Sequence, residues 1–89
     1  MLEKQLLIKN KVGLHARPAS LFVQKAKKFK CSLRLSFESR EADAKSILSV
    51  LVLGANEGAL VTLRAEGEDE VLAMEEMSTL VESNFGETI

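Results

Sequence analysis

The 89-residue sequence contains one cysteine, one histidine and one proline, and it contains no tryptophan and no tyrosine. A lone cysteine cannot form an internal disulfide, and one cysteine with one histidine cannot supply the four ligands of a structural zinc site. We therefore expect Cys31 to be a free thiol, which suits a reducing cytoplasm.

The chain also lacks an excess of either charge, since 12 Lys and Arg residues are balanced by 13 Asp and Glu residues. With four Phe as its only aromatic residues, it offers neither a basic surface nor a stacking surface for nucleic acid. No apolar run approaches the length of a membrane span, and residues 1–5 lack the apolar segment of a signal peptide. These absences predict a cytoplasmic protein that binds no nucleic acid and does not insert into a membrane.

Hydrophobic periodicity predicts the element order strand, helix, strand, strand, helix, strand, helix within one small domain, residues 1–89. The expected strands span residues 2–9, 32–37, 41–45 and 61–65. The expected helices start near Ala16, at Ile47 and at the acidic residues 68–70, which complement a helix N-terminus. Half-polar strands and helices with one apolar stripe each favour an α+β fold whose antiparallel sheet is covered on one face. The pattern alone equally allows a ferredoxin-like arrangement with an extra helix.

The only histidine lies at the predicted start of the first helix. Pro18 has a fixed φ and no N–H, so it fits the first helical turn and places His15 at or next to the N-cap. The unpaired N–H groups of that turn can hold an anion beside His15, and Arg17 adds a planar set of donors for phosphate. Imidazole forms covalent intermediates. The arrangement therefore predicts phosphoryl capture on His15, with a solvated or helix-capping histidine as the alternative.

Residues 13–19, Gly-Leu-His-Ala-Arg-Pro-Ala, resemble the active-site signature of HPr, the histidine phosphocarrier family of the bacterial sugar phosphotransferase system. A second match is Lys-Ser-Ile-Leu at residues 45–48, followed by Leu-Gly at residues 53–54, which is similar to the regulatory serine of that family and the short helix after it. The likeness extends over essentially the whole chain. It implies an open-faced β-sandwich of βαββαβα order, in which three helices cover one face of a four-stranded antiparallel sheet.

The resemblance implies a phosphocarrier rather than a stand-alone enzyme. Nδ1 of His15 would accept a phosphoryl group from phosphorylated enzyme I and pass it to EIIA-type components of sugar transport. Arg17 and the first-turn N–H groups, that of Ala16 included, would stabilise the transferred charge. The resemblance implies no metal and no organic cofactor, and it implies a monomer. It leaves open the sugar or the nitrogen branch of the family, and with it the downstream sugars or regulators.

Ser46 is a preferred N-cap residue for the helix at residues 47–53, and Gly54 is its expected C-cap. In some lineages of the family this serine is the target of an ATP-dependent HPr kinase, and in others it is present without that regulation, so both roles stay open. A phosphate on Ser46 would add a charge of about −1.5 to −2 near His15 and oppose transfer by repulsion. The alternative function is a regulatory adaptor, switched at Ser46, that binds a kinase/phosphorylase or a transcriptional regulator.

The helix at residues 47–53 is too short to bury all of its apolar side chains. The apolar residues of this helix are therefore either plain core residues or part of a small exposed apolar patch, of the kind that marks interaction sites. With polar residues of the first helix, that patch resembles the HPr surface that docks enzyme I and acceptor proteins. The residues of this expected docking surface are Arg17, Ser20, Gln24, Lys27, Ile47, Leu48 and Leu51.

Val12 stands where many sugar-type HPr proteins have a small polar residue that can hydrogen-bond the active imidazole. An apolar side chain cannot form that bond. We therefore expect backbone groups or water to orient the ring of His15.

Overall fold

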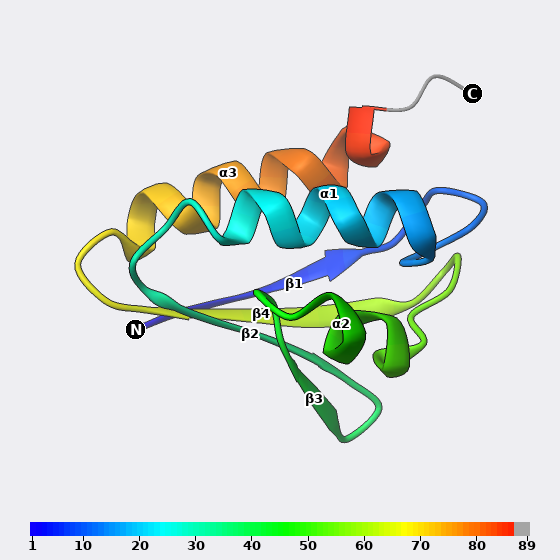
Figure 1. Ribbon diagram of the computed structural model, residues 1–89, viewed down its shortest axis with the longest axis horizontal. Helices are drawn as coiled ribbons and strands as arrows, with labels where there is room; N and C mark the ends of the chain where they lie inside the picture. Colours follow the sequence, from blue (N-terminus) through cyan, green and yellow to red (C-terminus); the bar gives the residue numbers. More distant parts are fainter. Residues whose placement is uncertain (87–89) are drawn as a thin grey trace.

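The computed structural model describes residues 1–86, and its elements follow the predicted order (Figure 1). The strands are β1 (Leu2–Leu7), β2 (Ser32–Phe37), β3 (Arg40–Asp43) and β4 (Leu60–Glu66). The helices are α1 (Ala16–Ala26), α2 (Ile47–Leu53) and α3 (Glu70–Glu82), followed by the 3-10 helix η1 (Asn84–Gly86). Within the described residues, none of the helices is long and apolar enough to cross a membrane.

The four strands form one antiparallel sheet in the order β1-β4-β2-β3. The strand β4 is therefore central, with Val61 opposite Leu6 of β1 and Leu63 opposite Leu35 of β2. Figure 1 shows α1 and α3 side by side along one face of the sheet, and α2 lies against β3. This is the open-faced α+β sandwich that the resemblance to HPr implied.

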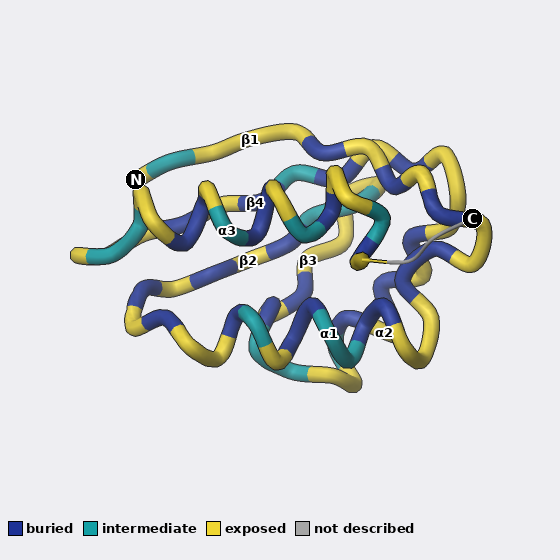
Figure 2. Tube along the Cα trace, turned by 90° about the horizontal axis from the view of Figure 1, so that it is seen from above, coloured by how far each residue is buried: buried dark blue, intermediate teal, exposed yellow. Residues whose placement is uncertain are grey.

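The core lies between the sheet and the apolar stripes of the helices. Figure 2 shows buried and exposed segments alternating along α1 and α3, as one-sided packing requires. The apolar residues at helical spacing in and after the first helix are all buried. Ala19, Phe22, Val23 and Ala26 lie on α1, and Phe29 follows the end of the helix at Ala26. The apolar stripe of α3 is buried at Ala73, Met74, Met77 and Val81 and partly buried at Leu80. The helical periodicity therefore predicted both packing faces correctly.

The bounds of three strands differ from the prediction, and β4 spans Leu60–Glu66 instead of residues 61–65. The strand β1 ends at Leu7 instead of residue 9. The strand β3 spans Arg40–Asp43 instead of residues 41–45. Its earlier start follows from Glu38 and Ser39, which both take left-handed φ values, 50° and 68°. Those angles close a two-residue hairpin turn, whose twist matches that of the flanking strands. The turn brings Arg40 opposite the last residue of β2 and starts β3 one residue earlier.

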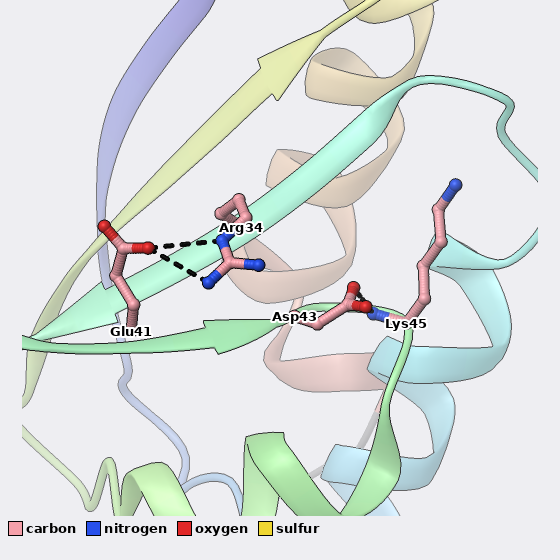
Figure 3. Close-up of polar contacts among 4 residues, drawn as sticks. All are labelled: Arg34, Glu41, Asp43 and Lys45. Carbon is pink, nitrogen blue, oxygen red and sulfur yellow. Dashed lines mark hydrogen bonds and ion pairs between the residues drawn. The ribbon is translucent and has the colours of Figure 1, made fainter.

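The uncovered face of the sheet carries paired charges. Arg34 of β2 donates through Nε and a terminal guanidinium nitrogen to Oε1 of Glu41 on β3, at 3.2 and 3.1 Å (Figure 3). Arg64 of β4 donates in the same way to Glu3 of β1, at 3.0 and 2.8 Å, and this bond raises the pKa of Arg64. Because every one of these groups is exposed, the pairs add little stability. They keep this face of the sheet polar.

Candidate functional site

The helix α1 begins at Ala16, as predicted, and His15 is its N-cap residue. His15 has an extended backbone, and its carbonyl accepts the N–H of Ala19 at 2.8 Å. The exposed imidazole makes no capping hydrogen bond, so the alternative of a helix-capping side chain is excluded. In the first turn, the N–H groups of Ala16 and Arg17 have no intrahelical acceptor. The ring therefore lies beside an open helix N-terminus, where unpaired donors face solvent.

The loop that carries His15 is held by buried polar contacts. Asn10 is buried, and its Nδ2 donates to the carbonyl of Gly13 at 3.0 Å while its own carbonyl accepts the N–H of Gly13 at 3.2 Å. The next residue, Leu14, is buried and donates its N–H to the carbonyl of Ala55 at 2.8 Å. The loop from β1 to α1 is thereby tied to the loop from α2 to β4. These hydrogen bonds fix the position of the loop that presents His15 at the protein surface.

The ring of His15 has one side-chain partner in the described part of the chain. Its Nε2 lies 3.3 Å from Oδ1 of Asn56, in the loop between α2 and β4. The expectation that only backbone groups or water contact the ring is therefore wrong, because a side chain from a distant loop lies within hydrogen-bond distance of it. Asn56 looked like an ordinary turn residue in the sequence, and nothing local in the sequence indicates that the two loops meet.

A shallow hollow of about 420 Å³ adjoins the ring and is lined by Lys11, Val12, His15, Asn56 and Glu57. Its opening to solvent leaves the ring accessible to a partner protein. Nδ1 of His15 makes no hydrogen bond with any residue in the range 1–86. The arrangement thus has one ring nitrogen engaged and the other available.

Arg17 is exposed on the first turn of α1 and makes no hydrogen bond or ion pair with another described residue. A cation is slightly unfavourable at the positive end of a helix. A guanidinium without a carboxylate partner at that position is available to an incoming anion. The placement agrees with the predicted phosphate-binding role, although the role itself stays a prediction.

The expected docking surface is exposed where α1 and α2 pack side by side. On α2, the exposed fractions of Ile47, Leu48 and Leu51 are 42%, 69% and 39%. These residues are therefore not plain core residues. On α1, Gln24 donates to the hydroxyl of partly buried Ser20 at 3.1 Å, and Lys27 is exposed at the C-cap. The structure brings the apolar residues of α2 beside the polar face of α1.

Ser46 caps α2 as predicted. Its hydroxyl accepts the N–H of Ser49 at 3.3 Å, and Gly54 ends the helix with a left-handed φ of 72°. The approach to the cap is shaped by Asp43, whose Oδ1 accepts the backbone N–H of Lys45 at 3.0 Å (Figure 3). Ser46 is only partly buried.

The single cysteine lies beyond the opposite end of α1 from His15. Asp69 accepts the backbone N–H groups of Lys30 and Cys31 at 2.8 and 2.9 Å, which lowers the pKa of its carboxyl group. Burial, together with this neighbouring carboxylate, raises the pKa of the Cys31 thiol to about 11. In residues 1–86 no cluster of three or more His, Cys, Asp or Glu side chains is arranged to hold a metal ion.

The chain is similar to known phosphocarriers over nearly its full length. Residues 2–83 match the family model described as PTS HPr component phosphorylation site. The phosphocarrier protein HPr of Xylella fastidiosa is 45% identical over 87 residues, which cover 98% of each chain. The crystal structure of HPr-C-His from Thermoanaerobacter tengcongensis is 46% identical, covers 100% of both chains and superposes with a TM-score of 0.97. The Bacillus subtilis catabolite repression protein Crh, described as a dimer with a swapping domain, is 38% identical, with coverages of 94% and 97% and a TM-score of 0.75.

Proposed function

Because this chain belongs to the HPr family of phosphocarrier proteins of the phosphotransferase system, we propose that its His15 imidazole is the group that carries the phosphoryl moiety. The observation that supports this most is the position of the ring: it is exposed at the open N-terminus of α1, with Nδ1 unengaged by described residues. A carrier must be reached by a donor and by an acceptor in turn. A group at the mouth of a shallow hollow meets that requirement.

The proposed transfer is a substitution at phosphorus. The lone pair of Nδ1 forms a nitrogen–phosphorus bond while the bond from phosphorus to the donor atom of phosphorylated enzyme I breaks, and the electrons of that bond stay with the donor. A second substitution then moves the group to a histidine or cysteine of a later transport component: a bond from phosphorus to the acceptor atom forms while the nitrogen–phosphorus bond breaks, and the electrons of that bond return to Nδ1. Arg17 and the N–H groups of Ala16 and Arg17 hold the phosphoryl oxygens in both steps. Because a carrier must release its load, we expect these contacts to bind the phosphate only moderately.

The same reasoning makes the chain a carrier that takes part in two reactions of other proteins, not a stand-alone enzyme. Enzyme I and the acceptor would both dock on the surface formed by α1 and α2. Three exposed apolar residues of α2 supply the centre, and Arg17 and Lys27 supply positive charge at its side. Such a surface fits partners with an apolar contact surrounded by acidic groups.

A direct experiment tests the carrier function. The protein is incubated with phosphoenolpyruvate and enzyme I, and any phosphate is mapped. We expect an acid-labile, base-stable adduct on the wild type and none on His15→Ala. An adduct that persists in His15→Ala would place the phosphate on another residue and overturn the assignment.

The second candidate function is a regulatory adaptor that is phosphorylated at Ser46 by an HPr kinase/phosphorylase and binds a transcriptional regulator. Similarity to a catabolite repression protein favours it. The retention of His15 argues against a purely adaptor role. Incubation with ATP and an HPr kinase distinguishes the two, since an adaptor gives only an acid-stable adduct that is lost in Ser46→Ala.

We further propose that the chain acts as a cytoplasmic monomer. Because a structural relative is described as a swapped dimer, light scattering of the purified protein is the appropriate test. A mass of one chain supports the monomer, and a mass of two chains contradicts it.

A further inference from the structure

We propose that Asn56 is the positioning residue of the carrier site: its side-chain oxygen holds the proton of His15 on Nε2 and so leaves Nδ1 unprotonated as the nucleophile. This inference deepens the proposed function and rests on His15 as the phosphorylated group. It concerns which ring nitrogen carries the proton before any partner arrives.

The geometry of the ring supports the assignment. A neutral imidazole has one N–H donor and one nitrogen acceptor, and a carboxamide oxygen can only accept. Oδ1 of Asn56 lies 3.3 Å from Nε2 of His15, so a hydrogen bond at this position requires the proton on Nε2. The lone pair is then on Nδ1. The hydrogen bond of one ring nitrogen sets the role of the other.

The backbone holds Asn56 in place. The preceding residue, Ala55, accepts the N–H of Leu14 at 2.8 Å, and the carbonyl of Asn56 accepts the N–H of Ala59 at 3.0 Å. On the other side, Gly13 approaches so closely that a Cβ there would stand 2.6 Å from Cα of Asn56. His15 and Asn56 therefore belong to loops that are fixed to each other through the backbone. This fixed backbone geometry keeps their side chains close together.

No other side chain of the hollow is bonded to the ring in the described structure. Val12 lines the same hollow and is 51% exposed, but it carries no acceptor. Glu57 also lines the hollow and has a carboxylate, yet no hydrogen bond joins it to His15. Asn56 therefore supplies, from the loop between α2 and β4, the polar contact that Val12 cannot supply. Glu57 is the matched control, because it is the neighbouring residue in the same hollow.

Nitrogen-15 NMR of the imidazole ring tests the proposal on the full-length, unphosphorylated protein. The spectra are recorded at a pH at which titration of the same resonances shows the ring to be neutral. For the wild type and Glu57→Gln, we expect a protonated-type shift for Nε2 and an unprotonated-type shift for Nδ1. Asn56→Ala should move both shifts toward each other, as the two tautomers mix. Asn56→Asp keeps an acceptor and should keep the wild-type pattern.

The rate of phosphoryl acceptance gives the functional readout. Loss of one hydrogen bond predicts that Asn56→Ala accepts phosphate from phosphorylated enzyme I roughly two- to tenfold more slowly, while Glu57→Gln changes less. Ring shifts in Asn56→Ala identical to those of the wild type would overturn the positioning role. So would a loss of the wild-type pattern in Asn56→Asp.

The two readouts separate this inference from the carrier function. If the wild type takes phosphate on His15 and the ring shifts of Asn56→Ala equal those of the wild type, only the role of Asn56 is refuted. A wild type that takes no phosphate refutes the carrier function, and the ring shifts still decide whether Asn56 sets the tautomer.

Discussion

Gly13 lies directly against Asn56: a Cβ on Gly13 would stand 2.6 Å from Cα of Asn56 and 2.5 Å from the carbonyl oxygen of Ala55. The φ of Gly13 is +64°, a value that other residues adopt at a cost. Only glycine lets the loop before α1 and the loop after α2 touch backbone to backbone. The contact joins the loop that carries His15 to the residue that we propose positions its ring.

Gly13→Ala should therefore disturb both the fold and the site. We expect the free energy of unfolding to fall by about 2 kcal/mol or more, because the new methyl group must displace backbone atoms. Gly58→Ala is the control: its φ is +88°, but nothing lies within 4 Å of the added Cβ. That variant should lose only about 1 kcal/mol, the cost of the left-handed backbone. Urea denaturation gives both values, and equal losses would show that the close approach is unimportant.

Ala16→Pro removes a single proposed phosphate donor without breaking α1. Proline is well tolerated at the first helical position, and the extended backbone of His15, with ψ of −169°, suits a residue before proline. We expect stability within about 1 kcal/mol of the wild type. Acceptance from phosphorylated enzyme I should fall by about tenfold, since a hydrogen bond to a charged group is lost. Ala16→Gly keeps the N–H and is the control. Equal transfer rates for the proline and glycine variants would remove the Ala16 N–H from the mechanism.

The local features of the fold and site were predictable from the sequence. Pro18 places the start of α1, Ser46 and Gly54 place the ends of α2, and the structure confirms all three positions. Each depends on the backbone preferences of a few consecutive residues. The strand order could not be predicted from such local preferences, because half-polar strands and helices with one apolar stripe fit several sheet topologies. The resemblance to HPr distinguished among them.

Contacts between distant loops were not predictable. Asn56 is 41 residues from His15, and Asp69 is 38 residues from Cys31. Turn and cap preferences account for polar residues at Asn56 and Asp69 without any long-range partner. Their contacts follow only from how the loops at the two ends of the sheet pack. The periodicity that predicts a helix carries no information on which loops meet.

Leu48→Ala should weaken docking and spare the fold. Leu48 is 69% exposed on α2, so its truncation removes few core contacts. Leu53, on the same helix, is 1% exposed and is the control. We expect Leu53→Ala to lose about 2 to 5 kcal/mol of stability, and Leu48→Ala to lose less than about 1 kcal/mol. Titration with enzyme I should show weaker binding by Leu48→Ala. Unchanged binding would exclude Leu48 from the docking surface.

Substitutions at Ser46 separate its capping role from the effect of charge. Ser46→Ala removes the bond to the N–H of Ser49 and should lower stability by about 1 kcal/mol. Ser46→Asp keeps an acceptor at the N-cap and should be close to the wild type in stability. If negative charge at Ser46 opposes transfer, only the aspartate variant accepts phosphate on His15 more slowly, and added salt reduces the difference. Equal transfer rates for both variants would contradict control by charge.

Cys31 should be almost unreactive in the native protein, because its pKa is raised to about 11 and its side chain is buried. At pH 8 such a thiol is ionised in roughly one molecule in a thousand, whereas an ordinary cysteine is ionised in roughly a quarter. A disulfide reagent should therefore label native protein at least a hundredfold more slowly than protein unfolded in urea.

The same raised pKa has a defined effect on stability. A folded-state pKa above that of the unfolded chain means that the neutral thiol contributes fully below the unfolded pKa. That contribution is lost as the pH rises toward about 11. The difference in unfolding free energy between the wild type and Cys31→Ala should therefore shrink between pH 8 and pH 11. Measurements by urea denaturation at a series of pH values test this, and a difference that stays constant would show that the folded environment does not hold the thiol protonated.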